Sequence, residues 1–457
     1  MSRALATDLY ELNMAASYLR RGMREPATFS LFVRDLPPDR GYLVAAGIED
    51  CLDYLERFRF APEDLEWMAA AGFGPEDVRA LGDLRFTGDV HAVPEGRVVL
   101  AGEPLLEVTA PLPEAQIVET QLLNQVTFQT ALASKASRCA VAAGGIELVE
   151  FSLRRTHGTE AGMAMSRLAA IAGFTGTSNV EAARRYGLRA VGTMAHSYVE
   201  AFPTERHAFR AFATDLPDRP LTFLVDTYDP LSGVQAAIDV IDELGLIGNP
   251  AAPVAVRLDS GNLLELARQT RALLDASGLA SVGIFVSGSL DELRLDRLFR
   301  DAAPIDAAGV GTRLGVSADA PYLDSSYKLV AVGGRAVAKL STGKAHLPGA
   351  KQVWRRPPDP DLITMRDENA PPGAEPLLLP AMQDGRRTRP RTTIAAARGR
   401  LVADRAALPT AALGLRRPTP PSVAVSARLQ SAQDELGARA GRRAAARVPD
   451  RTRRHDT

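Results

Sequence analysis

Short apolar runs recur through the middle of the chain, and stretches with helical periodicity separate them. The runs cover residues 146–151, 189–192, 221–225, 253–256, 282–286 and 306–310. Most consecutive runs end about 30 residues apart, which is the length of one strand with its crossover helix. Apolar runs without polar alternation are typical of parallel strands that are buried on both faces. The pattern predicts an α/β fold, built as a βα barrel or a close relative of one.

The regions before and after this repeat have a different pattern. A helical pattern at 8–20 precedes strand-prone segments interrupted by Gly and Pro, as in a small antiparallel unit. After Tyr327 strand-like runs return, and a helix is predicted at 394–408. We therefore expect an N-terminal α+β domain (1–125), a βα-barrel domain (126–326), a C-terminal segment that packs back on the N-terminal domain and completes it (327–439), and a disordered tail (440–457).

The composition is that of an ordinary globular protein. The chain has 457 residues, of which 46% are hydrophobic and 24% are charged, enough for two or three domains. No apolar stretch reaches the roughly 18 residues that a transmembrane helix needs, and the N-terminus lacks a signal-peptide core. Cys51 and Cys139 are too few for a disulfide framework and do not have the spacing of metal ligands. We expect a cytoplasmic protein without a membrane partner.

The net charge of −1 conceals a basic C-terminal region. Residues 385–457 contain 17 Arg and no Lys against 5 acidic residues, a balance of +12, which leaves −13 for the rest of the chain. One interpretation is a tail that binds nucleic acid. Ala and Pro dilute these arginines, however, and no aromatic residue lies between them. We therefore expect no nucleic-acid partner.

Polar or glycine-rich residues follow every apolar run. In a βα barrel the carboxyl ends of the strands meet on one face, where active sites are built. Arg154 and Arg155 follow one run, and Arg257 lies at the end of another. Because a guanidinium group suits bidentate recognition of carboxylate or phosphate, these residues favour an anionic ligand. The alternative is a set of surface arginines paired with acidic residues.

Two small-residue loops and an acidic residue add to this face. Backbone N–H groups and hydroxyls in Ser287-Gly288-Ser289 and in Gly309-Val310-Gly311-Thr312 can cradle a phosphate. Asp259 follows Arg257 by two positions, so strand alternation lets both side chains point into one pocket. An acid there can hold ribose hydroxyls or, through water, Mg²⁺. The alternative is an N-cap for the next helix.

His196 is the histidine with the most informative surroundings. It follows Gly192-Thr193 at a strand end, and Asp226 ends the next predicted strand. A neighbouring Asp would orient the imidazole and leave one nitrogen free as a nucleophile or base. A structural histidine is the alternative. Tyr10 lies in a predicted amphipathic helix, where core packing is the ordinary role of an aromatic residue.

Nine segments occur in the order found in the nicotinate phosphoribosyltransferase family, and the chain resembles this family from about Thr7 to at least Leu429. The segments are TDLYELNM, FSLRRTHG, FTGTSNV, GTMAHSYV, LVDTYD, VRLDSG, VSGSLDE, GVGT and YKLV. Any one of them would be weak, whereas the ordered set is specific. The resemblance implies an irregular βα (TIM-like) barrel with a second domain, and a homodimer whose active sites are shared between subunits.

The same resemblance implies a reaction of NAD biosynthesis and salvage. Nicotinate, phosphoribosyl pyrophosphate, ATP and water give nicotinate mononucleotide, pyrophosphate, ADP and phosphate, so that the enzyme is classed as a ligase. ATP is then a co-substrate, and Mg²⁺ is the expected cofactor. Nicotinamide phosphoribosyltransferase, which shares the fold and the chemistry, is the alternative.

The resemblance also implies roles for individual residues. His196 matches the histidine that ATP phosphorylates transiently, and Asp226 matches its partner. Four residues match nicotinate-binding positions of the family. Phe151 matches the aromatic residue that stacks on the pyridine ring, and Tyr10 matches the one that stacks from the other subunit. The other two are Thr193 and Arg257. The phosphoribosyl and phosphate positions match Arg154, Asp259, Gly288, Ser289, Gly311 and Thr312.

The chain departs from the family pattern beside the arginine pair. The common form has Gly and Ala where Ser152 and Thr156 stand, and His157 follows them. Ser152 adds a Cβ atom where the backbone is expected to approach the ligand. Nicotinamide enzymes carry Asp where this chain has Ser178. Because a serine hydroxyl can donate a hydrogen bond to a carboxylate, Ser178 favours nicotinate over the amide.

Overall fold

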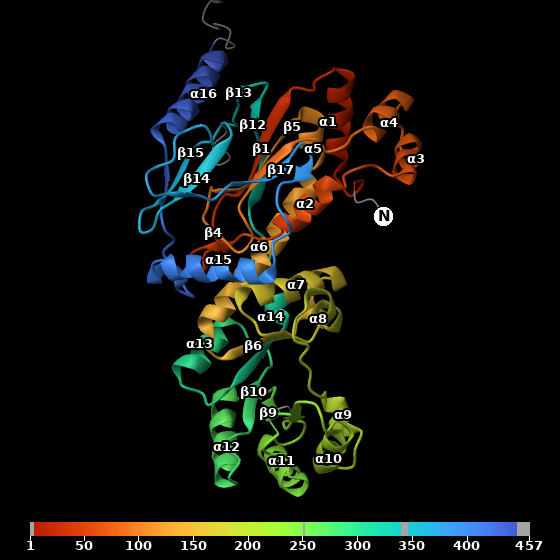
Figure 1. The fold of residues 1–457 in the computed structure, drawn as a ribbon, viewed down its shortest axis with the longest axis vertical. Coiled ribbons are helices and arrows are strands. Elements are labelled where there is room, and N and C mark those ends of the chain that lie inside the picture. Colours follow the sequence, from red (N-terminus) through yellow and green to blue (C-terminus); the bar gives the residue numbers. More distant parts are fainter. Residues whose placement is uncertain (1–3, 250–251, 340–345, 446–457) are drawn as a thin grey trace, which may run out of the picture. The chain divides into compact units, whose positions relative to one another are not determined.

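A computed structural model describes residues 4–249, 252–339 and 346–445. The chain divides into two compact units, and it passes from unit 1 to unit 2 within helix α6 (Glu119–Ala142) (Figure 1). Unit 1 comprises residues 1–130, 322–414 and 418–457, and unit 2 comprises residues 131–321 and 415–417.

Unit 1 is built around a seven-stranded sheet in the order β13-β12-β1-β5-β3-β17-β18. Its strands are β1 (Pro26–Val33), β3 (Asp89–Ala92), β5 (Pro104–Pro111), β12 (Ser325–Val332), β13 (Arg335–Ala336), β17 (Leu379–Gln383) and β18 (Arg386–Arg387). The helices of unit 1 are α1 (Leu9–Arg20), α2 (Ile48–Glu56), α3 (Pro62–Ala70), α4 (Pro75–Gly82), α5 (Leu112–Ile117), α15 (Ile394–Ala407) and α16 (Ala427–Ala445), with the 3-10 turn η2 (Thr410–Leu413).

Strands from the two ends of the chain pair inside this sheet. β12 runs antiparallel to β1, and Tyr327 of β12 lies opposite Leu31. The Tyr327 ring stacks on Phe29, with 4.8 Å between ring centroids, and its hydroxyl donates to the carbonyl of Ala115 at 2.7 Å. These buried contacts join segments far apart in the sequence and hold the sheet together.

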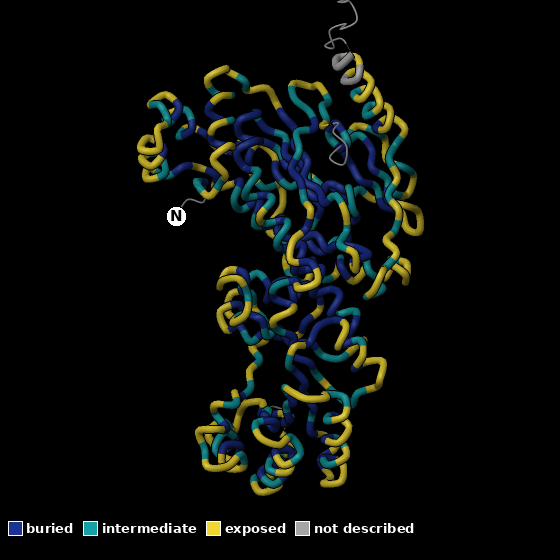
Figure 2. The backbone as a smooth tube through the Cα atoms, turned by 180° about the vertical axis from the view of Figure 1, so that it is seen from behind, coloured by how far each residue is buried: buried dark blue, intermediate teal, exposed yellow. Residues whose placement is uncertain are grey.

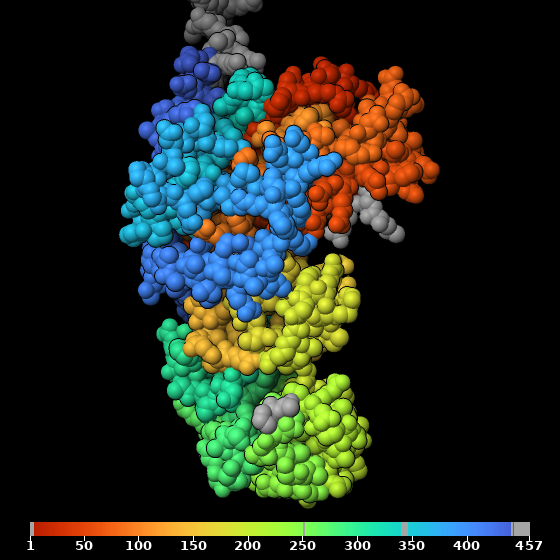
Figure 3. All heavy atoms as spheres, in the orientation of Figure 1, coloured from red at the N-terminus to blue at the C-terminus, as the bar shows by residue number. Residues whose placement is uncertain are grey.

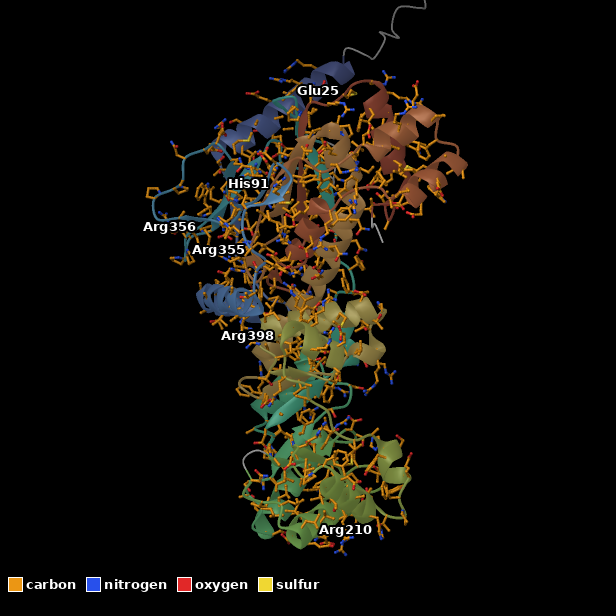
Figure 4. All side chains as sticks on the ribbon, turned by 45° about the vertical axis from the view of Figure 1, so that its right-hand side comes forward. Glu25, His91, Arg210, Arg355, Arg356 and Arg398 are labelled. Carbon is orange, nitrogen blue, oxygen red and sulfur yellow. The ribbon has the colours of Figure 1, made fainter. Side chains whose placement is uncertain are left out.

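Two smaller sheets complete unit 1. One has four strands in the order β16-β14-β15-β19, and the other pairs β2 with β4. Their bounds are β2 (Leu43–Val44), β4 (Val98–Val99), β14 (Lys351–Arg355), β15 (Asp361–Met365), β16 (Glu375–Pro376) and β19 (Val423–Val425). Arg355, at the end of β14, is largely buried and forms ion pairs with Asp361 at 2.5 Å and Asp404 at 3.1 Å (Figure 4).

Unit 2 contains a six-stranded parallel sheet in the order β7-β6-β11-β10-β9-β8. Its strands are β6 (Glu147–Glu150), β7 (Gly176–Thr177), β8 (Leu221–Leu224), β9 (Val254–Leu258), β10 (Gly283–Val286) and β11 (Ala307–Val310). Because all six run in one direction, their carboxyl ends lie along one edge of the sheet. Figure 2 shows buried residues concentrated along these strands.

Helices follow the strands of unit 2 in regular alternation. They are α7 (Thr159–Ala172), α8 (Val180–Tyr186), α9 (His196–Glu200), α10 (Glu205–Asp215), α11 (Pro230–Leu244), α12 (Leu263–Ala276), α13 (Glu292–Arg300) and α14 (Thr312–Gly315), with the 3-10 turn η1 (Leu153–Arg155). α11 shows why they begin where they do. The Asp229 carboxylate accepts from the N–H of Ser232, and Pro230 occupies the first turn. α10 packs on α11 at the surface of unit 2, where Arg210 pairs with Glu243 (Figures 3 and 4).

The predicted α/β class is confirmed, and five of the six predicted strands occur in a parallel sheet. The sixth prediction, 189–192, is wrong. Only Ala190 forms an isolated bridge, and its partner Thr177 belongs to β7, which is not among the predicted strands. β7 has two residues, too few to produce an apolar run. The sheet has edges at β7 and β8, so a closed TIM-like barrel stays a prediction.

Candidate active site

Arg257, in β9, is the centre of a hydrogen-bond network at the carboxyl edge of the unit 2 sheet. Its Nε atom donates to Ser287 Oγ, its Nη1 atom to Thr193 Oγ1 and its Nη2 atom to Asp259 Oδ1, each at 2.8 Å. These partners come from the loop after β10, the segment before α9 and the end of β9. Since the side chain is only 11% exposed, the guanidinium group has a defined orientation.

An aromatic surface lies beside this cation. The Arg257 guanidinium carbon is 5.8 Å from the centroid of the Phe151 ring, and Phe151 packs on Phe285 at 5.6 Å. A Cβ atom on Gly309 would lie 2.6 Å from the Phe151 ring, so this position in β11 must be glycine for the ring to stay there. A half-buried ring next to a positive charge is suited to a flat, anionic aromatic ligand.

His196 begins α9 and reaches the same network. Its Nδ1 atom is 3.1 Å from Thr227 Oγ1, and its Nε2 atom is 4.0 Å from Asp259 Oδ2. The side chain is 41% exposed, and Nε2 has no hydrogen-bond partner among the described residues. Thr227, which the sequence interpretation did not select, is therefore the hydrogen-bond partner of the imidazole.

Asp226 supports the loop after β9. Its Oδ2 atom accepts from the N–H of Asp259 at 2.9 Å and from the Ser260 hydroxyl at 2.6 Å. The side chain is buried, and its Oδ1 atom has no hydrogen-bond partner within the part of the chain that the structure describes. The next residue, Thr227, is the one that contacts the imidazole.

Asp259 connects the arginine with the histidine. Burial raises the pKa of its carboxyl, but the hydrogen bond from Ser287 and the charge of Arg257 outweigh this effect and keep the pKa below its ordinary value. Asp259 is therefore ionised at neutral pH. Its Oδ1 atom accepts from Arg257, and its Oδ2 atom faces His196.

The two small-residue loops approach their neighbours closely. Gly288 has φ +93°, and a Cβ atom there would lie 1.9 Å from the Asp259 carbonyl oxygen, so only glycine fits. Ser289 follows with φ +52° and is exposed. A Cβ atom on Gly311 would lie 3.0 Å from the Phe151 carbonyl oxygen, and Thr312, also exposed, begins α14. The loops therefore lie beside the residues of the Arg257 network.

Arg154 and Arg155 project from η1, immediately after Ser152. Both are exposed, and neither side chain has an ion pair or hydrogen bond among the described residues. Ser152 itself is fully buried, and its hydroxyl donates to Glu150. Ser178 follows β7, is half-buried, and donates its N–H to the Glu150 carbonyl at 2.9 Å.

Tyr10 belongs to unit 1, whereas the other predicted site residues belong to unit 2. It lies in the first turn of α1 and is 46% exposed. Partial burial, with the charges of Glu119 and Glu11, raises the pKa of its hydroxyl, so Tyr10 is protonated at neutral pH. The structure therefore shows a partly exposed aromatic ring at the start of the first helix.

The sequence interpretation missed several supporting residues, and one of them had a visible signal. Glu150 is an acidic residue near the end of the apolar run 146–151, where an apolar residue would be ordinary. Phe285 and Thr227 had no such signal, because a buried aromatic residue and a threonine after an aspartate are common. Another histidine, His91 in β3, differs from His196, because burial lowers its pKa to about 4 and keeps it neutral (Figure 4).

Within the described ranges, no helix has the length and apolar composition required to cross a membrane. The same residues contain no cluster of three or more His, Cys, Asp or Glu side chains arranged to hold a metal ion. The two cysteines, Cys51 and Cys139, are buried and free.

Comparisons with known proteins agree over most of the chain. Residues 5–127 match the nicotinate phosphoribosyltransferase (NAPRTase) N-terminal domain, and residues 146–344 match the nicotinate phosphoribosyltransferase (NAPRTase) family. The chain is 48% identical to Mycobacterium tuberculosis nicotinate phosphoribosyltransferase pncB2, covering 84% of this chain and 83% of that protein. It is 41% identical to the Bacillus subtilis nicotinate phosphoribosyltransferase, covering 78% and 73%.

Two solved structures superpose on most of the chain. The crystal structure of human nicotinic acid phosphoribosyltransferase superposes with a TM-score of 0.83 at 30% identity, covering 94% of this chain and 99% of that one. A nicotinate-nucleotide pyrophosphorylase from Pyrococcus furiosus superposes with a TM-score of 0.73 at 26% identity, covering 88% and 95%.

Proposed function

The chain belongs to the nicotinate phosphoribosyltransferase family, and from this premise we propose how its residues transfer a phosphoribosyl group to nicotinate. The ring nitrogen of nicotinate attacks the anomeric carbon of phosphoribosyl pyrophosphate, a new C–N bond forms, and the bond to pyrophosphate breaks. The observation that carries this assignment is the oriented guanidinium of Arg257 beside the Phe151 ring.

Arg257 and Phe151 together explain why nicotinate is the acceptor. Hydrogen bonds at 2.8 Å to Thr193, Asp259 and Ser287 leave one Nη2 N–H of Arg257 without a partner in the described structure. We assign this donor and the positive charge to the nicotinate carboxylate. Stacking on Phe151 adds about 0.5–1.5 kcal/mol beyond area burial. Ser178 supplies a second donor suited to a carboxylate, which disfavours the amide of nicotinamide.

Arg154 and the loops at Gly288-Ser289 and Gly311-Thr312 are assigned to the phosphates. The exposed guanidinium of Arg154 is free to neutralise the pyrophosphate, whose negative charge grows as it leaves. Gly288 and Gly311 let the backbone N–H groups of their loops approach the 5-phosphate. The hydroxyls of Ser289 and Thr312 are exposed beside these groups.

The residues fit a magnesium ion. Asp226 has a buried oxygen, Oδ1, without a hydrogen-bond partner among the described residues, and the ionised Asp259 is tied to it through its N–H group. Mg²⁺ typically takes one or two carboxylates together with water and substrate phosphates. Asp226 and Asp259 would hold it, and the ion would supply positive charge to the pyrophosphate group. Asp259 is also placed to accept from the ribose hydroxyls.

We assign ATP coupling to His196. With Nδ1 held by Thr227, the Nε2 lone pair is free to attack the γ-phosphorus of ATP, forming a P–N bond and releasing ADP. Water later cleaves the P–N bond and gives phosphate. The Nε2 atom lies 4.0 Å from Asp259 Oδ2, so a phosphoryl group bound to it would add negative charge beside this carboxylate. The added charge would favour binding of the magnesium ion.

Tyr10 is assigned to the second face of the nicotinate ring in a homodimer. Its ring is 46% exposed although it is a large aromatic residue in an amphipathic helix. A two-fold symmetric dimer would deliver one such ring to each active site. Both phosphorylated co-substrates are cytoplasmic metabolites, so the proposal places the enzyme in the cytoplasm.

Product analysis tests the proposal directly. The purified chain is mixed with nicotinate, phosphoribosyl pyrophosphate, Mg²⁺ and ATP, and the products are separated by chromatography. We expect nicotinate mononucleotide and pyrophosphate, with ADP and phosphate formed in parallel. Nicotinamide replaces nicotinate in a second reaction. Faster turnover of nicotinamide would overturn the substrate assignment, and product formation at full rate without ATP would overturn the coupling.

A further inference from the structure

Glu150 is a buried carboxylate behind the proposed nicotinate site. It is the last residue of β6, and it is 0% exposed. Its Oε1 atom accepts from the N–H of Ser152 at 2.5 Å and from the Ser152 hydroxyl. Its Oε2 atom accepts from the hydroxyls of Thr177 at 2.5 Å and Ser166 at 2.9 Å. Every partner is a donor, which matches the acceptor role of a carboxylate.

No cationic side chain pairs with Glu150 in the residues that the structure describes. Burying a charge without an opposite charge costs more free energy than burying an apolar side chain of the same size. A leucine in this apolar run would avoid that cost. The benefit of the carboxylate must therefore come from what its two oxygens connect.

The carboxylate connects the loops that follow β6 and β7. Ser152 begins the first loop, directly after Phe151 and directly before the turn that carries Arg154. Thr177 ends β7 and directly precedes Ser178. The two oxygens of one carboxylate lie at a fixed separation, so the two loops are held in one relative position.

The connection continues into α8. The Thr177 hydroxyl oxygen accepts from the N–H of Asn179 at 3.0 Å, and the Asn179 side chain in turn caps the helix by accepting from the N–H of Ala182 at 3.1 Å. Ser178 therefore lies between two anchored residues. The Ser178 N–H itself is bound to the carbonyl of Glu150.

Glu150 does not belong to the surface that would touch the ligand. Consecutive side chains of a strand point to opposite faces. Phe151 packs on Phe285 and Arg257, whereas the Glu150 side chain reaches Ser166, on α7. Its influence on a ligand must act through the loops.

We propose that Glu150 is a positioning residue that shapes the nicotinate site by holding Phe151 and Ser178 in a fixed position relative to each other. This inference rests on the proposed function, because it assumes that these two residues contact nicotinate. Loss of the connection should weaken nicotinate binding. The KM for phosphoribosyl pyrophosphate should change little when only the Thr177 side of the connection is broken, because Ser152, next to the turn that carries Arg154, then stays bound to Glu150.

Two matched pairs of variants test this role. Thr177→Val removes one donor to Glu150, and Thr177→Ser restores the hydroxyl. Thr175→Val is the control. Thr175 directly precedes β7, and its hydroxyl donates at 2.7 Å to Glu147, the first residue of β6. Glu150→Gln is likewise compared with Glu147→Gln. KM and kcat are measured for both substrates, with the thermal midpoint of unfolding as a control for folding.

We expect Thr177→Val and Glu150→Gln to raise the KM for nicotinate about tenfold or more, as loss of a hydrogen bond to a charged group does. For Thr177→Val the KM for phosphoribosyl pyrophosphate should stay within about twofold, and Thr177→Ser should restore the KM for nicotinate. The two controls should behave like the unmodified chain. A lower unfolding midpoint with unchanged KM values, or equal increases for both substrates in Thr177→Val, would show that Glu150 is only structural.

The outcomes also separate this inference from the proposed function. If the unmodified chain and both controls form nicotinate mononucleotide while Thr177→Val and Glu150→Gln match them, only the positioning role fails. If the unmodified chain forms no nicotinate mononucleotide, the proposed function fails and the positioning role fails with it.

Discussion

The Nε2 atom of His196 lies 4.0 Å from the Oδ2 atom of Asp259, and this separation leaves the nitrogen without a hydrogen bond while keeping it beside an ionised carboxylate. The other ring nitrogen is bound to Thr227. Within the described residues, the imidazole therefore has one nitrogen held by a hydrogen bond and one that lies beside Asp259 without a hydrogen bond. Thr227 orients the imidazole ring, and Asp259 places a negative charge beside its Nε2 atom.

We expect γ-labelled ATP with Mg²⁺ to label the protein on His196. The label should be acid-labile and base-stable, because protonation of the ring nitrogen releases the phosphate. His196→Ala should abolish labelling, and nicotinate with phosphoribosyl pyrophosphate should speed its release. Thr227→Val and Asp226→Asn should slow labelling without abolishing it, since each disturbs the surroundings of the ring and not the nucleophile. Labelling of His196→Ala would move the nucleophile elsewhere, with His157 as the next candidate.

Arg257→Ala should weaken nicotinate binding far more than ATP binding. The lost interaction is a charge-assisted hydrogen bond, about 1.5–3 kcal/mol, or roughly 10–150-fold in the dissociation constant. Titration calorimetry with each ligand separately measures both effects. Equal losses for nicotinate and ATP would point instead to a folding defect caused by the unpaired Asp259.

Gly309→Ala should raise the KM for nicotinate by roughly tenfold, because the new methyl group would lie 2.6 Å from the Phe151 ring and displace it. Gly283→Ala, in the neighbouring strand β10, is the matched control. Its methyl group would meet its nearest neighbour at 3.5 Å, an ordinary contact. Steady-state kinetics of both variants compare the positions, and equal KM values would argue against stacking on Phe151.

Tyr10→Ala should lower activity if its ring stacks on nicotinate from the partner subunit, while Tyr10→Phe, which keeps the ring, should stay active. Mixing Tyr10→Ala with His196→Ala should restore part of the activity after subunit exchange. A mixed dimer would then contain one site with both native residues. No recovery after verified exchange would show that each site is built within one chain.

The stability of unit 1 should depend on the ionisation of Glu11. Burial raises the pKa of this carboxyl from 4.5 to about 7, although hydrogen bonds from Thr7 and Thr120 oppose the change. Between these values the folded state keeps a proton that the unfolded chain has lost. Stability should therefore fall as the pH rises through this range, by at most about 3 kcal/mol.

Glu11→Gln should remove this part of the pH dependence. Thermal unfolding followed by circular dichroism from pH 5 to about pH 8 measures the effect for the variant and the unmodified chain. Glu25→Gln, at an exposed carboxylate of the same unit, is the control and should keep the original dependence (Figure 4). Identical curves for Glu11→Gln and the unmodified chain would contradict the raised pKa.

Local patterns were sufficient to predict the framework of unit 2. Five apolar runs became β6, β8, β9, β10 and β11, because a strand buried on both faces has a continuous apolar signature. Strand β7 was not predicted. It has two residues, Gly176 and Thr177, and neither is strongly apolar, so its place in the sheet depends on pairing with β6.

At the candidate active site, too, local patterns predicted some contacts and not others. Alternation along one strand was enough to predict that Arg257 and Asp259 lie together, since both belong to β9 and its end. The partner of His196 could not be predicted in this way. Asp226 and Thr227 are neighbours in sequence, and only the folded positions of their side chains give Thr227 a hydrogen bond to the imidazole and Asp226 one to Asp259.

By itself, the sequence determined the α/β class, the edge of the sheet where polar residues gather, and the ordered segments of the family. These properties follow from short-range patterns, in which residue type and spacing carry the information. Only the tertiary structure decided that Thr227 binds His196, that Asp226 supports the loop after β9, and that Glu150 joins two loops. Hydrogen bonds depend on ångström distances between segments tens of residues apart, and such distances exist only once the chain has folded.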